Sequence, residues 1–105
     1  MQKWDIWLAN VRFEDNPEES KLRPVLVIDK QNMFILSFKM TSHTPRQNFY
    51  GEYSIKYYKE AGLVKPTVIR LSKKLLLLEN EFIHQIGRLH PYDINEVYKI
   101  LNSKK

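Results

Sequence analysis

The 105-residue chain contains no cysteine and only 3 histidines, at His43, His84 and His90. Without cysteine it can form no disulfide, thiol nucleophile or cysteine-ligated zinc site, and the scattered histidines argue against a metal centre. It also lacks an apolar run near the roughly 18 residues that a membrane helix needs, and no apolar signal region follows Lys3. We therefore expect a cytoplasmic protein that needs no metal or other cofactor.

The composition that is present is typical of one folded domain. Hydrophobic residues make up 43% of the chain, aromatic residues 12% and charged residues 28%, with 3 glycines and 5 prolines. These proportions indicate a soluble globular protein, and an independent core usually requires about 100 residues. We expect one domain that spans residues 1–105.

The positive charge is concentrated in one part of the chain. The net charge is +5, yet the first 20 residues hold two basic and five acidic residues. Between Lys39 and Lys74 there are eight basic and two acidic residues, interleaved with aromatic ones. Single-stranded nucleic acid requires cations for its phosphates and rings for its bases, so this segment indicates nucleic-acid binding. The same pattern also fits a solvated lysine surface over buried tyrosines.

The first half of the chain predicts three strands in a meander. Residues 5–13 alternate in polarity as a half-buried strand does. Residues 24–28 are apolar throughout, which predicts a strand buried on both faces with Pro24 at its first position. After a turn over residues 29–32, residues 34–40 predict the third strand, and the acidic stretch 14–21 predicts a loop.

The second half predicts a mixture of short strands and helices. Residues 41–51 predict a polar loop that is long enough to indicate a functional role. Ser54 is expected to cap a short helix that ends at Ala61, before a left-handed Gly62. Residues 67–71, 75–78 and 85–89 predict further strands.

The C-terminal segment predicts an amphipathic helix. Pro91 suits its first position, Asp93 complements its positive N-terminus, and His90 precedes it in a structural role. The apolar stripe is Ile94, Val97, Tyr98 and Leu101. Taken together, the elements predict a mainly β (α+β) fold, in which a curled antiparallel sheet or small barrel is packed by a short helix and a C-terminal amphipathic helix.

Four segments, in their order along the chain, are similar to those of a known family. They are DIWLAN at 5–10, RPVLVI at 23–28, a strand closing on KMTS at 39–42, and KPTVIRL at 65–71 followed by IGRL at 86–89. In this order they resemble the MazF/PemK (Kid-like) toxins of type II toxin–antitoxin systems. The resemblance spans nearly the whole chain, and it implies an SH3-like barrel and a homodimer.

The resemblance implies a metal-independent endoribonuclease that cuts single-stranded RNA, including mRNA, at specific sequences. In that reaction the 2′-hydroxyl attacks the adjacent phosphorus and leaves a 2′,3′-cyclic phosphate and a 5′-hydroxyl. Negative charge gathers on the phosphoryl oxygens, so a fixed cation and hydrogen-bond donors are required. Arg23, held just before a buried strand, is the expected phosphate stabiliser and a candidate proton donor, and Thr41 is the expected second donor.

Other residues are secondary candidates. Ser42 is an alternative to Thr41, His43 is a candidate general base, and Arg70 is a second phosphate contact. Ser72 stands where the Kid-like pattern has an aspartate two residues after the arginine, so the proton acceptor remains open. The expected RNA-binding residues are Lys21, Lys39, Arg46, Tyr50 and Lys73.

Ordinary structural roles compete with these assignments. Arg23 could simply pair with Glu18 or Glu19, and Thr41 could be a plain strand-end hydroxyl. Arg70 and His43 fit equally well as solvated surface residues.

The partners expected from the resemblance are single-stranded RNA and a cognate antitoxin with an acidic, disordered tail that competes for the basic surface. Two other functions stay open. One is a CcdB-like gyrase poison of the same fold, which requires a Trp-Gly-Ile C-terminus, whereas this chain ends in LNSKK at 101–105. The other is a barrel that binds RNA or DNA without catalysis.

Overall fold

The structure is a computed structural model that describes residues 1–12, 16, 18–42 and 51–103. Its elements, in chain order, are β1 (Asp5–Arg12), β2 (Ser20–Gln31), β3 (Phe34–Thr41), β4 (Glu52–Ser54), β5 (Val68–Leu78), the 3-10 turn η1 (Glu79–Glu81), β6 (Phe82–Arg88) and α1 (Pro91–Asn102). Of the helices in these residues, none has the length and apolar character that crossing a lipid bilayer requires.

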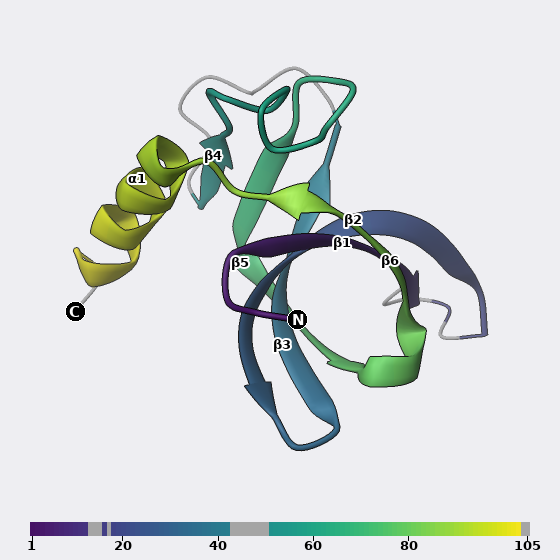
Figure 1. The fold of residues 1–105 in the computed structure, drawn as a ribbon. Coiled ribbons are helices and arrows are strands. Elements are labelled where there is room, and N and C mark those ends of the chain that lie inside the picture. Colours follow the sequence, from purple (N-terminus) through teal and green to yellow (C-terminus); the bar gives the residue numbers. More distant parts are fainter. Residues whose placement is uncertain (13–15, 17, 43–50, 104–105) are drawn as a thin grey trace.

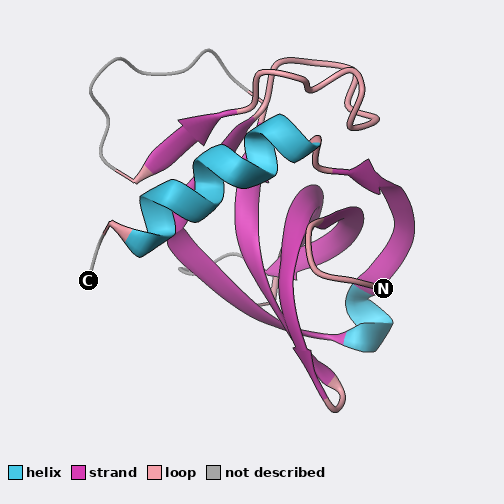
Figure 2. Cartoon of the chain, turned by 60° about the vertical axis from the view of Figure 1, so that its left-hand side comes forward, coloured by secondary structure: helices cyan, strands magenta, loops and turns pink. Residues whose placement is uncertain are grey.

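The six strands form one antiparallel sheet in the order β4-β5-β3-β2-β1-β6. The sheet curls strongly round on itself, and α1 lies apart from the curl, beside β4 (Figure 1). The view in Figure 2 shows α1 running across one side of the sheet. Neighbouring β1, β2 and β3 confirm the predicted meander, and the sheet with its terminal helix confirms the mainly β class.

β2 is longer than predicted at both ends. Ser20 already pairs with β1, and pairing with β3 continues to Gln31, which leaves a two-residue turn at Asn32 and Met33. Asn32 has a φ of 58°, a conformation that asparagine tolerates better than most residues. Pro24 lies inside the strand, not at its start; the ladder with β3 begins only at the next residue, so Pro24 sits where one side of the strand is unpaired.

The strands predicted at 67–71 and 75–78 are in fact the single strand β5. Its pairing with β3 is interrupted, because Lys39 pairs with Arg70 whereas Phe38 pairs with Lys74. The intervening residues 71–73 have no partner on β3, and such an irregularity bends a strand. The polar break in the sequence therefore marks a bend in one strand.

The short helix predicted from Ser54 to Ala61 is wrong. Ser54 ends β4, where it pairs with Val68, and the N–H of Ile55 donates to the Thr67 carbonyl at 3.0 Å. Pairing with β5 thus takes the backbone groups that would have begun a helix.

The capping signal at the end of that segment is nevertheless real. The N–H of Gly62 donates to the Lys59 carbonyl at 3.0 Å, and that of Leu63 donates to the Tyr58 carbonyl at 2.9 Å. These two bonds ordinarily close a helix C-terminus, and Gly62 has the predicted left-handed conformation, with a φ of 94°. The motif closes a turn here, since no helix precedes it.

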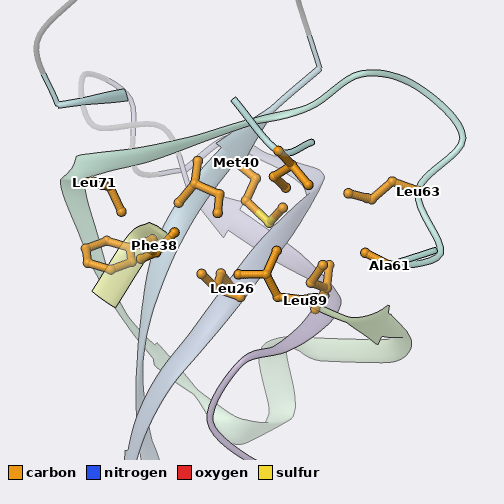
Figure 3. Packing of buried hydrophobic residues seen from close by; sticks show 11 residues of the cluster. Leu26, Phe38, Met40, Ala61, Leu63, Leu71 and Leu89 are labelled. Carbon is orange, nitrogen blue, oxygen red and sulfur yellow. The ribbon is translucent and has the colours of Figure 1, made fainter. Parts of the chain in front are cut away.

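The main hydrophobic core lies between the sheet and the segments that cover it (Figure 3). Its buried residues come from the strands, from the turn segment after β4 and from α1; they are Ile6, Leu26, Phe38, Met40, Ile55, Ala61, Leu63, Ile69, Leu71, Leu89 and Val97. A second cluster on the opposite side of the sheet consists of Ala9, Val11, Val25 and Leu77, with Trp7, Leu75 and Phe82 packed against it.

Helix α1 begins at Pro91 as predicted, and His90 is its N-cap. The Nδ1 atom of His90 accepts a hydrogen bond from the Tyr92 N–H at 3.1 Å, which confirms a structural role for this histidine. The predicted apolar stripe is wrong at Tyr98, which is 55% exposed, whereas Ile100 packs against the core.

Asp93 fastens α1 to the segment after β4. Its side chain is fully buried, and its carboxylate accepts hydrogen bonds from the Tyr53 hydroxyl at 2.5 Å and from the N–H groups of Lys56 and Tyr57 at 2.9 and 3.0 Å. A buried carboxylate requires such donors, so this contact is a strong constraint on the position of α1. Burial, together with the hydrogen bond to Asp93, raises the pKa of the Tyr53 phenol.

Replacing Tyr53 with phenylalanine is expected to lower the free energy of unfolding at pH 7 by about 1.5–3 kcal/mol, the usual contribution of a hydrogen bond to a charged group. Because the raised pKa keeps the phenol protonated in the folded state, this contribution is complete below the pKa of free tyrosine, 10.0. Above that pH the stability difference should shrink by up to about 1.4 kcal/mol per pH unit. Urea unfolding at pH 7 and at alkaline pH measures both effects; the exposed Tyr98→Phe is the control, and an equal pH dependence for both variants would contradict the assignment.

Candidate functional site

A row of polar side chains crosses three strands on the side of the sheet opposite α1. Glu52 on β4 lies opposite Arg70 on β5, and Arg70 lies opposite Lys39 on β3. Directly opposite residues of antiparallel strands project to the same side of a sheet. Tyr53, the neighbour of Glu52, points the other way and reaches α1.

Arg23 on β2 and Thr41 on β3 belong to the same side of the sheet as this row. Val25 lies opposite Lys39, and Arg23 and Thr41, each two residues along its own strand from this pair, therefore project to the same side of the sheet. Both residues are partly buried. We call Arg23, Lys39, Thr41, Glu52 and Arg70 the arginine face.

Arg23 lies on the part of β2 that pairs with β1 and precedes the pairing with β3. It pairs with Ala9 on β1 and is followed by Val25 and Leu26, both fully buried. Within the described residues, which include Glu18 and Glu19, Arg23 makes no ion pair with an acidic side chain. The alternative in which Arg23 pairs with one of these glutamates is therefore wrong for this structure.

Arg70 is held by Glu52. The Nε atom of Arg70 lies 3.5 Å from Oε2 of Glu52, and the two side chains are 25% and 4% exposed. In the described part of the chain, neither Glu52 oxygen nor the Arg70 Nε has a hydrogen-bond partner, so the contact is an ion pair without a hydrogen bond. Sequence reasoning missed Glu52, although it is one of only two acids between Lys39 and Lys74.

The structure places Ser42 at a pocket and Ser72 beside Gly51. Ser42 follows β3 and lines a pocket of about 490 Å³ on whose walls Pro24, Lys65 and His84 also lie. The side chain of Ser72 lies against Gly51, where a Cβ atom would come within 3.1 Å of its Cβ and Oγ. Gly51 also has a φ of 85°, so glycine is required there both by space and by conformation.

The remaining candidates fall in three places. Lys21 is exposed on β2 two residues before Arg23, hence on the same side of the sheet, and Lys73 lies at the bend of β5. His43, Arg46 and Tyr50 lie outside the described residues. Where the structure is described, no group of three His, Asp or Glu side chains gathers that could hold a metal ion.

The arginine face has the groups that a phosphodiester requires. Adjacent strands lie about 4.8 Å apart and successive same-side residues about 6.6 Å apart, so Arg23, Thr41 and Arg70 can reach one phosphate from three strands. Guanidinium groups bind phosphoryl oxygens through paired N–H donors, and a threonine hydroxyl adds a further donor. The arrangement can therefore bind a phosphate and stabilise added negative charge on it.

The family model described as "PemK-like, MazF-like toxin of type II toxin-antitoxin system" matches residues 2–103. Comparison with curated protein sequences found no match. The fold is similar to that of an endoribonuclease in complex with its cognate antitoxin from a mycobacterial species, with a TM-score of 0.71, 10% identity, and coverage of 93% of this chain and 87% of that chain. It is also similar to the Mycobacterium tuberculosis toxin MazF-mt6, with a TM-score of 0.69, 17% identity, and coverage of 90% and 89%.

Proposed function

Since the chain belongs to the PemK-like, MazF-like toxins of type II toxin–antitoxin systems, we propose that it is a metal-independent endoribonuclease that cuts single-stranded mRNA at specific sequences. The observation that supports this proposal is that alternation along β2, β3 and β5 directs Arg23, Thr41 and Arg70 to one side of the sheet. These are the residues for which the family resemblance implied a role in phosphate stabilisation.

The proposed reaction is an internal transfer on the RNA. The 2′-hydroxyl oxygen attacks the adjacent phosphorus while its proton leaves to solvent or to a basic group, and the bond from phosphorus to the 5′ oxygen breaks. The 5′ oxygen takes up a proton, so the products are a 2′,3′-cyclic phosphate and a 5′-hydroxyl. Arg23 stabilises the charge that develops on the phosphoryl oxygens, Thr41 donates a hydrogen bond to them, and Arg70 makes a further contact with the phosphate from β5.

Several further features belong to the same proposal. The strong curl of the sheet supports an SH3-like barrel that consists of one toxin domain (Figure 1). The protein is proposed to act as a homodimer in the cytoplasm, where mRNA occurs. An acidic antitoxin segment is expected to compete with RNA for the cations of the arginine face.

The direct test is to incubate the purified protein with a long single-stranded RNA in EDTA. Discrete fragments that carry a 5′-hydroxyl and a 2′,3′-cyclic phosphate are expected. A matched RNA with a 2′-deoxy sugar at the cut position should remain intact, because it lacks the nucleophile. Binding of RNA without cleavage would contradict the enzyme and support the non-catalytic alternative, whereas gyrase inhibition without RNA cleavage would support the CcdB-like one.

Thr41→Ala is expected to lower the cleavage rate about 10- to 100-fold, since it removes one neutral donor to a phosphoryl oxygen that gains charge. The same assay with a short RNA that the wild-type protein cuts measures this rate. Ser42→Ala is the matched control, because Ser42 faces the pocket beside Pro24. If the two variants lost activity equally, the placement of Thr41 at the phosphate would be wrong.

A further inference from the structure

We propose that Glu52 is a positioning residue that fixes the Arg70 guanidinium for phosphate contact. This inference rests on the proposed ribonuclease function. It assigns to β4 a part in the reaction that no motif in the sequence indicates.

The geometry of the ion pair leaves Arg70 available to a phosphate. The contact to Glu52 uses Nε, at 3.5 Å from Oε2. The two terminal nitrogens carry four of the five N–H donors of an arginine, and the contact does not need them. The Arg70 side chain remains 25% exposed, so it is accessible from the arginine face while its Nε side is anchored.

Glu52 itself is too buried to touch RNA. Its side chain is 4% exposed, and neither oxygen is accessible to solvent. A substrate group therefore meets Arg70 and not the carboxylate. Any effect of Glu52 on cleavage has to act through the orientation or charge of its arginine partner.

The buried charge of Glu52 depends on Arg70 for its compensation. A buried carboxylate is costly unless a cation or hydrogen-bond donors compensate it. In the described part of the chain Glu52 has no hydrogen-bond donor, and Arg70 is the cation paired with it. The next charged residue in the same row is Lys39 on β3. Glu52 consequently restricts Arg70 to orientations that keep the ion pair.

The carboxylate that pairs with Arg70 comes from a neighbouring strand, β4. Strand β5 contains no acidic residue, and the position two residues along the strand from Arg70 is Ser72. Here a carboxylate reaches the arginine across the sheet, from the residue directly opposite on β4. Glu52 thus provides at Arg70 a negative charge that β5 itself lacks at that place.

A double-mutant cycle tests the proposal. Glu52→Gln keeps the shape of the side chain and removes its charge, and we expect kcat to fall about 10- to 100-fold, as for a reacting group held slightly out of place. The affinity for an uncleavable 2′-deoxy RNA should stay the same or rise about two- to fivefold, because a negative charge has left a cationic surface. In an Arg70→Ala background, Glu52→Gln should change kcat less than threefold.

The controls separate this proposal from the general function. Glu60→Gln, the other acid between Lys39 and Lys74, is exposed and should leave kcat and affinity unchanged. If Glu52→Gln does not fold, Glu52→Asp keeps the charge, lengthens the ion pair and should show the same dependence on Arg70 with a smaller loss of kcat.

The outcomes are distinguishable. If the wild-type protein cleaves RNA but the kcat losses of the two single variants multiply in the double variant, the positioning role is overturned. The same holds if Glu52→Gln loses no activity. Both outcomes leave the ribonuclease proposal intact. Absence of cleavage by the wild-type protein would overturn both.

Discussion

Arg23→Ala is expected to lower the rate of RNA cleavage about 100- to 1000-fold, the largest loss of activity from any single substitution on the arginine face. The magnitude is that of removing one fixed donor from a site where negative charge develops, and a guanidinium presents two parallel donors with a full charge. The rate on a short RNA cut by the wild-type protein is the measurement.

Lys30→Ala is the matched control for this prediction. Lys30 lies on the same strand at its far end and makes an exposed ion pair with Glu79 at 3.3 Å, a contact of little energetic weight. Its removal should change the rate less than twofold. Arg23→Lys keeps the charge but loses the paired donors, so it should recover only part of the activity. Equal rates for Arg23→Ala and Lys30→Ala would remove Arg23 from the site.

Asp93→Ala is expected to produce the largest loss of stability, about 3–5 kcal/mol, because a buried charge-assisted network loses its acceptor. The Tyr53 hydroxyl and the N–H groups of Lys56 and Tyr57 would then lie without a partner. For a chain of this size the loss corresponds to a fall in Tm of roughly 12 °C or more. Urea unfolding at pH 7 measures the change in the free energy of unfolding.

Two variants sharpen this test. Asp93→Asn keeps the size of the side chain but offers one carbonyl oxygen in place of two carboxylate oxygens, so an intermediate loss of about 2 kcal/mol is expected. Asp29→Asn changes an exposed aspartate that accepts a hydrogen bond from the nearby exposed Gln31 side chain, and its effect should stay within about 0.5 kcal/mol. A similar loss of stability for Asp93→Ala and Asp29→Asn would show that the hydrogen bonds accepted by Asp93 contribute little to stability.

Local patterns in the chain were sufficient for the elements that depend on local physics. The meander of β1 to β3, the start of α1 at Pro91 and the left-handed Gly62 all follow from alternation, capping preferences and conformational freedom within a few residues. The segment after β4 shows the limit of such signals. Its helix-ending motif is present, yet pairing of Ser54 with β5 replaced the helix that the motif would have closed.

The candidate site divides in the same way. Arg23, Thr41 and Arg70 could be named from residue type, position beside a buried strand and family resemblance, and the register of β2, β3 and β5 places them on one side of the sheet. Ser42 could not be separated from Thr41 by sequence, because neighbours at a strand end point to different sides and only the fold decides which side holds the arginines.

Composition and order along the chain thus determined that this is a cysteine-free, basic, mainly β protein of the PemK-like, MazF-like toxin family. Only the tertiary structure decided two contacts, the ion pair of Glu52 with Arg70 and the hydrogen bond from Tyr53 to Asp93. Both contacts join residues far apart in sequence, and which carboxylate meets which partner depends on strand order, register and burial. No short-range pattern encodes these quantities.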